Sequence, residues 1–291
     1  NKIICVDNLF TGIKQNLSDI IDHENFTFIK HDIIHLLIND PLIIKENIDQ
    51  IYHLACPASP PKYQIDPIYT LKINFIGTMN ILELAREKKS KILLTSTSEI
   101  YGEPELSPQT EDYRGNVNTI GIRSCYDEGK RVAEALFVAY SDYNDVSVRI
   151  ARIFNTYGPY MDPNDGRVVS NFVVQALKNK PLTIYGDGSQ TRSFCFVDDL
   201  VSGLCKLLES DYNKPVNLGN PGELTMLELA DLIISITGSE STISFKELPV
   251  DDPKRRCPDI SIAKEQLGWS PEIDVRQGLE KTINWYREIL V

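Results

Sequence analysis

The runs Thr95-Ser96-Thr97-Ser98-Glu99-Ile100-Tyr101-Gly102 and Tyr126-Asp127-Glu128-Gly129-Lys130 decide how the rest of the chain is arranged. Tyr126 and Lys130 are four residues apart, so on a helix they share one face, one turn apart. We expect the ammonium to lower the pKa of the phenol, as a general base requires. Thr97, at the end of a strand, is expected to present its hydroxyl to the same reacting oxygen. The alternative interpretation is an amphipathic helix without a catalytic role, in which the Tyr and Lys side chains only extend to solvent with the same spacing.

Strand-like and helix-like segments alternate on both sides of these runs. Apolar residues at threes and fours predict one helix over 66–88 and a second over 124–143. Short apolar stretches predict strands over 2–7, 26–33, 50–56, 91–95 and 146–153. Strands that alternate with helices predict an α/β fold, a doubly wound parallel sheet of the Rossmann type.

Beyond Pro159 the pattern changes to loops, short strands and isolated helices. We therefore expect residues 1–159 to form a nucleotide-binding domain and residues 160–291 to form mainly a smaller α/β substrate lobe, with some later elements returning to the first domain. Thr225 and Glu228 form a capping box that starts a helix ending at Gly238, and 279–290 reads as a closing helix.

The first strand ends in an acid, Asp7. In a dinucleotide-binding βαβ unit, a strand ending in Asp normally comes second, about 20 residues after a glycine-rich turn, and its carboxylate binds a ribose hydroxyl. No such turn precedes Asp7, so the first βα unit is expected to be missing from this sequence, with weaker cofactor retention. With no Arg after the acid, NAD is favoured over NADP. A strand that simply ends at a polar turn is the alternative.

Composition excludes several classes of function. The 291 residues carry a formal net charge of −11, which disfavours nucleic acid or an anionic membrane as partner. No run reaches the roughly 18 apolar residues of a membrane span. The six cysteines form no CxxC pair and lie near no histidine at metal-ligand spacing, so we expect reduced thiols, no metal site and a cytoplasmic location.

Seven segments carry a resemblance to known proteins: 56–61, 95–102, 123–131, 151–159, 165–172, 185–194 and 217–221. Taken together, they resemble the extended short-chain dehydrogenase/reductases, and within them the UDP-glucuronate decarboxylase family. The likeness covers nearly the whole chain, and its one departure is the absent glycine-rich loop, which in relatives holds the cofactor pyrophosphate at a helix N-terminus.

The resemblance implies a set of site residues. The catalytic residues would be Thr97, Ser98, Glu99, Tyr126, Lys130 and Arg256. The NAD site would be lined by Asp7, Asn8, Phe10, Thr11, Gly12, Asp32, Ile33, Leu54, Ala55, Tyr126, Lys130 and Thr156. The UDP-sugar would be held by Asn155, Arg167, Tyr185, Arg192 and Arg256. Arginines suit a diphosphate because they form bidentate charge-assisted hydrogen bonds, although Arg167 and Arg192 could also be surface residues.

The implied reaction is NAD-dependent decarboxylation of UDP-glucuronate to UDP-xylose. A nucleotide-sugar 4-epimerase or 4,6-dehydratase is the first alternative, and an inactive NAD(H)-sensing or scaffold homologue is the second. Dehydratases of the family carry Asp-Glu after the threonine, whereas this chain has Ser98-Glu99, and 4-epimerases generally lack the glutamate. The resemblance also implies a homodimer through a four-helix bundle built from 66–88 and 124–143, and Lys254, Arg255 and Arg256 are expected over the sugar.

Overall fold

The computed structural model describes residues 1–248 and 255–290. Four parallel strands form the central sheet in the order β10-β5-β4-β3, and β1 and β2 form a separate parallel pair. Among the described strands, no ladder joins β1 to β3, so the sheet is divided at that point. The strands are β1 (Ile3–Asp7), β2 (Phe26–Lys30), β3 (Gln50–His53), β4 (Lys91–Thr97), β5 (Val148–Ile153) and β10 (Pro215–Leu218).

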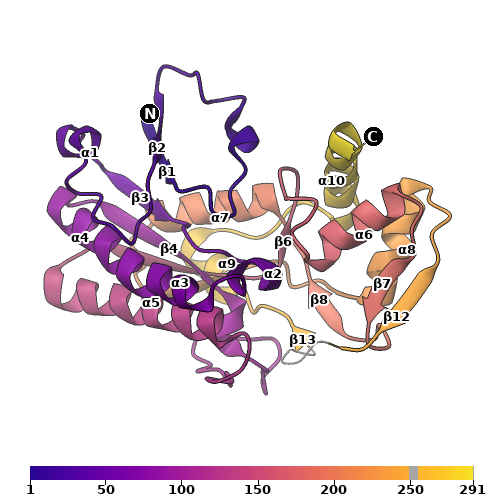
Figure 1. Cartoon of the computed structure of the whole chain (residues 1–291). Helices are drawn as coiled ribbons and strands as arrows, with labels where there is room; N and C mark the ends of the chain where they lie inside the picture. Colours follow the sequence, from indigo (N-terminus) through magenta and orange to yellow (C-terminus); the bar gives the residue numbers. More distant parts are fainter. Residues whose placement is uncertain (249–254, 291) are drawn as a thin grey trace.

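Helices cover both faces of the four-stranded sheet, which confirms the doubly wound fold (Figure 1). Ile92 and Leu94 of β4 pack into the same core cluster as residues of α4 and α5, whereas Leu93 between them packs with α7. This alternation follows from the two-residue period of a strand. The helices are α3 (Pro67–Lys72), α4 (Thr78–Lys88) and α5 (Ser124–Asn144) on one face, and α7 (Val197–Glu209) and α9 (Ser261–Leu267) on the other.

The helix predicted over 66–88 is interrupted by a π-helical turn. The turn, η2 (Ile73–Gly77), joins α3 to α4 and buries Asn74. Apolar spacing alone does not reveal a π turn, because one turn with an extra residue barely disturbs the period. Such turns are frequent at functional sites, and this one packs against α5.

A second core lies in the C-terminal part of the chain, where α6, α8 and α10 pack against β7. The Thr225–Glu228 capping box and the C-terminal Gly238 are confirmed, and the closing helix begins earlier than predicted. The elements are α6 (Val168–Leu177), β7 (Leu182–Tyr185), α8 (Met226–Thr237), β12 (Ile243–Lys246) and α10 (Val275–Leu290), with β6 (Thr156–Tyr157), β8 (Thr191–Ser193), β9 (Cys195–Phe196), β11 (Glu223–Thr225) and β13 (Arg255–Arg256).

Short elements complete the described chain. They are η1 (Lys14–Leu17), α1 (Pro41–Lys45), α2 (Pro60–Tyr63) and η3 (Ser98–Tyr101). None of the helices in the described ranges is both long enough and apolar enough to span a bilayer. Of the expected basic cluster, Arg255 and Arg256 are described, and Lys254 lies outside the described residues.

Candidate active site

Thr97, Tyr126 and Lys130 meet where β4 ends beside α5. Thr97 is the last residue of β4, and its Oγ1 accepts a hydrogen bond from the Glu99 amide at 3.2 Å, which caps η3. Tyr126 and Lys130 are both buried on α5. Lys130 Nζ donates to the Thr95 carbonyl at 2.9 Å and lies 6.0 Å from the centre of the Tyr126 ring. The three side chains therefore share one buried site.

The pKa of Tyr126 is raised, so the expectation that Lys130 lowers it is wrong for the protein by itself. Burial is the largest cause and Cys56 adds to it, while a hydrogen bond with Thr97 opposes both. Lys130 does not offset this, because burial lowers its own pKa and its ammonium is directed at the Thr95 carbonyl. A phenol in this setting is protonated at neutral pH.

The Tyr126 ring is held by a second tyrosine, Tyr63, at the end of α2. The two rings are stacked with centroids 4.8 Å apart and planes 4° apart. Behind them, Asn74 of the π turn donates to Cys56 Sγ at 3.2 Å. A Cβ at Gly129 would lie 2.9 Å from Asn74 Nδ2, so α5 approaches the π turn this closely because Gly129 has no side chain.

Glu99 is the centre of a buried ion cluster. Arg256 holds both of its carboxylate oxygens, and Arg123 Nη2 lies 2.7 Å from Oε2. Burial acts to raise the pKa of Glu99, but Arg256 and Arg123 outweigh burial and the pKa is lowered. The carboxylate is therefore ionised, and Glu99 orients two guanidinium groups whose charges act on Tyr63, the tyrosine stacked on Tyr126. Ser98, the first residue of η3, is also buried.

Asp127, the residue after the tyrosine, is buried in the same cluster, with 7% of its surface exposed. Burial raises its pKa to about 7, and the Glu99 charge adds to the effect while Arg123 and Arg256 oppose it. Three atoms at this site, Asp127 Oδ1, Arg256 Nε and Tyr63 Oη, are buried without a hydrogen-bond partner among the described residues. Buried polar atoms without partners are uncommon, and a catalytic role or a bound polar group is among the explanations for them.

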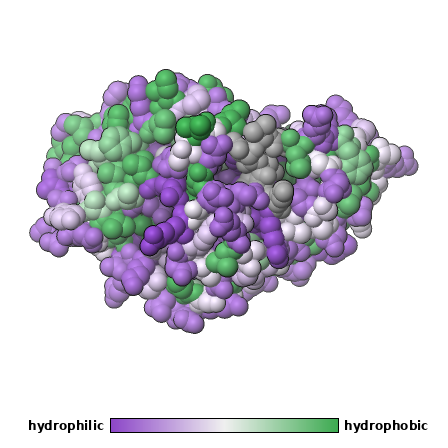
Figure 2. Space-filling view, turned by 90° about the horizontal axis from the view of Figure 1, so that it is seen from below, coloured by the Kyte–Doolittle hydropathy of each residue, from purple (hydrophilic) through white to green (hydrophobic). Residues whose placement is uncertain are grey.

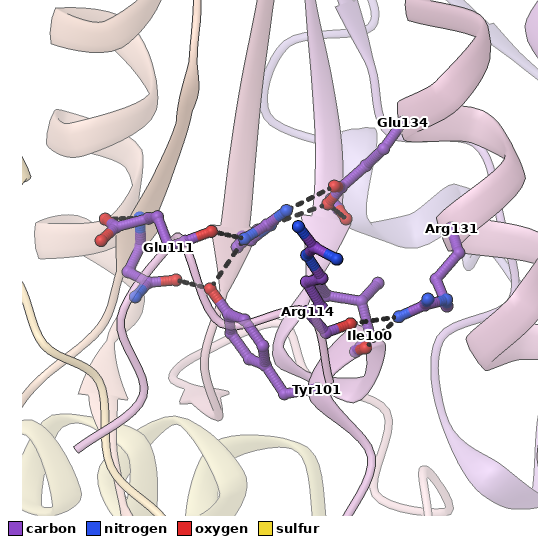
Figure 3. Close-up of polar contacts among 9 residues, drawn as sticks. Ile100, Tyr101, Glu111, Arg114, Arg131 and Glu134 are labelled. Carbon is purple, nitrogen blue, oxygen red and sulfur yellow. Dashed lines mark hydrogen bonds and ion pairs between the residues drawn. The ribbon is translucent and has the colours of Figure 1, made fainter. Parts of the chain in front are cut away.

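A second buried network holds η3 from behind (Figure 3). Tyr101 Oη donates to Asn217 at 2.8 Å and accepts from Arg152 Nη1 at 3.0 Å. Glu134 of α5 accepts from Arg152 Nη2 at 2.8 Å and from Ser96 Oγ at 2.5 Å. This network joins β4, β5, β10 and α5, so the η3 turn that carries Glu99 is fixed on the sheet.

Figure 3 also shows a clamp on the outer side of η3. Arg131 Nη1 donates to the carbonyls of Ile100 and Arg114, each at 2.9 Å, and Arg152 donates to the Glu111 carbonyl at 2.7 Å. Because Arg131 is five residues after Tyr126 on the same helix, the clamp ties the loop before α5 to the helix that carries the tyrosine.

Several residues expected at the cofactor lie together at the carboxyl ends of β1 and β2. Asn8 Nδ2 donates to Asp32 Oδ2 at 3.0 Å, and Tyr69 of α3 also donates to that oxygen. Burial opposes the change, but hydrogen bonds from Tyr69, the Ile34 amide and Asn8 lower the pKa of Asp32. Phe10 packs edge-on against Tyr69, with ring centroids 5.0 Å apart.

The remaining expected cofactor residues lie near the carboxyl ends of strands in both parallel sheets. Asp7 Oδ1 accepts from the Leu9 amide at 2.6 Å, and a Cβ at Gly12 would lie 3.1 Å from Asp7 Oδ2. Leu54 follows β3 with 58% of its surface exposed. An exposed large apolar side chain at the carboxyl end of a parallel strand fits a ligand with a flat ring, as NAD has. Thr11, Ile33 and Ala55 occupy the loops after β1, β2 and β3, and Thr156 is the first residue of β6.

The residues expected at the UDP-sugar lie on three strands and in two loops. Arg192 of β8 is the register partner of Arg256 in β13, which brings one expected nucleotide-binding arginine next to the Glu99 cluster. Arg167 precedes α6 and is paired with Asp165 at 2.5 Å. Asn155 lies between β5 and β6, and its carbonyl accepts from the Cys195 amide. Tyr185 ends β7 with its side chain partly exposed.

Sequence reasoning gave no role to Tyr63, Tyr69, Arg123 or Asp127. Arg123 and Asp127 flank Tyr126, and a signal was available for both, since a charged residue within one turn of a buried tyrosine needs a partner. Tyr63 had no comparable signal, because its stacking on Tyr126 depends on how the proline-rich loop 57–61 folds back on α5.

Comparisons with known proteins agree with this geometry. The family model for GDP-mannose 4,6 dehydratase matches residues 3–282. UDP-glucuronic acid decarboxylase 1 of Danio rerio is 55% identical over 98% of the chain and 67% of its own length. UDP-glucuronic acid decarboxylase 1 of Arabidopsis thaliana is 53% identical over 99% of this chain and 64% of its own length. UDP-glucuronic acid decarboxylase 6 of the same plant is 54% identical over 96% of this chain and 79% of its own length. The chain thus spans about two thirds of the first two relatives.

Two solved structures share the fold over almost the whole chain. The UDP-glucose 4-epimerase of Thermotoga maritima, solved with UDP-glucose, has a TM-score of 0.91 at 27% identity and covers 100% of this chain and 92% of its own. The UDP-glucuronic acid 4-epimerase of Bacillus cereus, in complex with UDP-glucuronic acid and NAD, has a TM-score of 0.87 at 28% identity and covers 99% and 91%. The chain belongs to the extended short-chain dehydrogenase/reductases, in the family of the UDP-glucuronic acid decarboxylases.

Proposed function

We propose that the protein decarboxylates UDP-glucuronate to UDP-xylose with NAD as a cofactor that is regenerated in each turnover. The observation that carries the proposal is the pairing of two buried arginines, Arg123 and Arg256, with Glu99, where their charges act on Tyr63, the tyrosine stacked on the Tyr126 ring. In a sugar whose C4 hydroxyl reaches Tyr126, the next ring carbon, C5, carries its substituent close to the same site. A carboxylate there would give the two guanidinium groups, which already pair with Glu99, a second charge-assisted acceptor.

The chain's own residues divide the work between proton transfer and orientation. Tyr126 takes the proton of the C4 hydroxyl, and Thr97 holds the same oxygen. NAD, when bound, would supply the hydride acceptor and later the hydride donor, and the positive charge of its oxidised form would favour the phenolate of Tyr126. With C4 oxidised, the electron pair of the C5–C6 bond can move into the C4 carbonyl as carbon dioxide leaves. Arg256 orients the carboxylate, and Glu99 holds Arg256 in place.

The two parts of the chain are assigned to the two ligands. Residues 1–159, with the returning α7, β10 and α9, would bind NAD through Asp7 at the ribose and through Asp32 and Ile33 at the adenine. The rest of 160–291 would bind the UDP group, with Arg167 and Arg192 on the diphosphate. The remaining residues of the two sites are Asn8, Phe10, Thr11, Gly12, Leu54, Ala55, Lys130 and Thr156 for NAD and Asn155 and Tyr185 for UDP.

A 4-epimerase is the second candidate, because the Bacillus cereus neighbour is named as acting on UDP-glucuronic acid with the same fold. Both enzymes would oxidise C4, but only the decarboxylase loses C6. The test is incubation with UDP-glucuronate and NAD⁺ in deuterated water. We expect carbon dioxide, UDP-xylose with one deuterium at C5, and no accumulation of NADH. UDP-galacturonate with all carbons retained would refute decarboxylation.

The protein is also proposed to form a homodimer through α3, η2, α4 and α5. Ile68, Leu71 and Phe75 lie on this helical face with 67%, 42% and 46% of their surfaces exposed. Figure 2 shows apolar residues gathered on the left of the lower face, the side where Figure 1 draws these helices. A contiguous exposed apolar patch on a soluble domain is typical of an interface.

The dimer is tested by sedimentation of Phe75→Glu. A charge in the helix bundle should convert dimer to monomer, because a buried unpaired carboxylate destabilises an interface. Val201→Glu is the matched control, since Val201 is 50% exposed but lies on α7. A monomeric wild-type protein, or a dimeric Phe75→Glu variant, would refute the interface.

A further inference from the structure

Asp127 is a buried acid for which the proton relay has no use. It lies on α5 next to Tyr126, 7% exposed, and its Oδ1 has no hydrogen-bond partner in the described part of the chain. A buried carboxylate that serves only to stabilise the fold is normally hydrogen-bonded at both oxygens. A group that entered the Glu99 cluster would change the surroundings of Asp127, and under the proposed function that group is the substrate.

The charges around Asp127 come from each element packed on it. Glu99 of η3 contributes a negative charge, Arg123 and Arg256 contribute positive charges, and Glu128 on the same helix adds a weaker negative charge. Tyr63 Oη is the nearby neutral donor, and its pKa is affected by the same charges. Among the described residues, two buried carboxylates thus face two guanidinium groups.

A substrate carboxylate would add a third negative charge to this cluster. An additional negative charge favours the neutral form of the acid that is easiest to protonate. Arg123 and Arg256 keep Glu99 ionised. Burial leaves Asp127, with a pKa of about 7, as the acid that gains a proton.

The reaction itself consumes one proton. The C5–C6 bond breaks, its electron pair forms an enolate with the C4 oxygen, carbon dioxide leaves as a neutral molecule, and C5 then receives a proton. The carboxylate charge that entered with the substrate is thereby removed from the arginine cluster. An acid that was protonated because of that charge is then free to release its proton.

We propose that Asp127 is a proton store, which takes up a proton from solvent when the substrate carboxylate enters the Glu99–Arg123–Arg256 cluster and releases it after carbon dioxide has left. The proposal rests on the proposed function, because the carboxylate must occupy this cluster. Asp127 acts through the charge of the site and is a positioning residue.

The test measures proton uptake when UDP-glucuronate binds. Tyr126→Phe, loaded with NAD⁺, serves as the background because it blocks turnover. Titration calorimetry at pH 7 in two buffers with different ionisation enthalpies gives the number of protons taken up. We expect about half a proton, because a group with a pKa near 7 is half protonated beforehand. Uptake should be absent at pH 5, where Asp127 is already protonated.

Three controls assign the uptake. Adding Asp127→Asn should abolish it, and adding Glu128→Gln should retain most of it, because Glu128 makes the smallest of the cited contributions to the pKa of Asp127. UDP-glucose, which has no carboxylate, should bind without uptake. These last measurements need no Asp127 variant, so they test the proposal even if that variant does not fold.

The outcomes separate this inference from the proposed function. Binding of UDP-glucuronate without proton uptake, or equal uptake in Asp127→Asn, would overturn the proton store and leave decarboxylation in place. Equal uptake with UDP-glucose would overturn it as well. Failure of UDP-glucuronate to bind at all would overturn both.

Discussion

Asp127 makes the stability of the protein depend on pH in an unusual direction. Its pKa is about 7 in the folded chain, against an ordinary value of 3.8. The folded state therefore binds this proton more tightly than the unfolded state. The resulting stabilisation is fully present below about pH 4 and is lost as the pH rises to about 7. At 1.36 kcal/mol per pH unit, the loss amounts to roughly 4 kcal/mol.

Asp127→Asn should remove this dependence, because the amide stays neutral at every pH. Relative to wild type, the variant should gain stability between pH 4 and pH 8. The gain corresponds to an unfolding midpoint that rises by on the order of 10 °C, at 2–4 °C for each kcal/mol in a chain of this size. Thermal unfolding of both proteins across this pH range is the assay.

The control is Glu128→Gln, which removes a carboxylate from the same helix at a partly exposed position. Its midpoint should follow wild type at every pH. A constant difference between wild type and Asp127→Asn from pH 4 to pH 8 would refute the reasoning, because it would mean that Asp127 is ionised throughout that range.

Three further predictions concern the reaction. Tyr126→Phe keeps the stacking on Tyr63 but removes the base, so turnover should fall by about 10²-fold or more while the unfolding midpoint is retained; near-normal turnover would contradict the role of Tyr126. Arg256→Ala should slow carbon dioxide release more than it weakens UDP-glucuronate binding, since stabilisation that grows toward the transition state is what speeds a step. If Arg256→Ala weakened UDP-glucuronate binding more than it slowed carbon dioxide release, the role of Arg256 in the bond-breaking step would be refuted. Asp7→Ala should reduce the preference for NAD⁺ over NADP⁺ in titrations of both cofactors, because the repulsion of a 2′-phosphate is removed; an unchanged ratio would rule out the ribose assignment.

Much of the fold could be predicted because it follows from local periodicity. The strands around Ile92 and Val148 are short apolar runs, and helix α5 follows the threes-and-fours pattern that also places Tyr126 and Lys130 on one face. Thr97 could be placed at the site because it ends a buried strand of a parallel sheet, where ligands gather.

The rest depends on contacts between distant segments. Glu99 and Arg256 are 157 residues apart, and their pairing exists only because β13 is added beside β8. The direction in which the Tyr126 pKa shifts was also predicted wrongly. A spacing of four residues indicates that Lys130 is near Tyr126, but it does not show that the Lys130 ammonium donates its hydrogen bond to the Thr95 carbonyl. Burial, which dominates that pKa, is a property of the packed molecule.

The π turn at 73–77 has a consequence for how this family can change by insertion and deletion. A π turn holds one residue more than an α turn, so it behaves as a single-residue insertion in an otherwise regular helix. Deleting one residue there would restore a continuous α-helix with α3 and α4 still in register, and their packing would persist. Asn74 now donates a hydrogen bond to Cys56 and lies against Gly129. In a regular α-helix its side chain would leave both contacts. A shorter homologue could therefore keep the scaffold and lose this contact behind the tyrosine in one event.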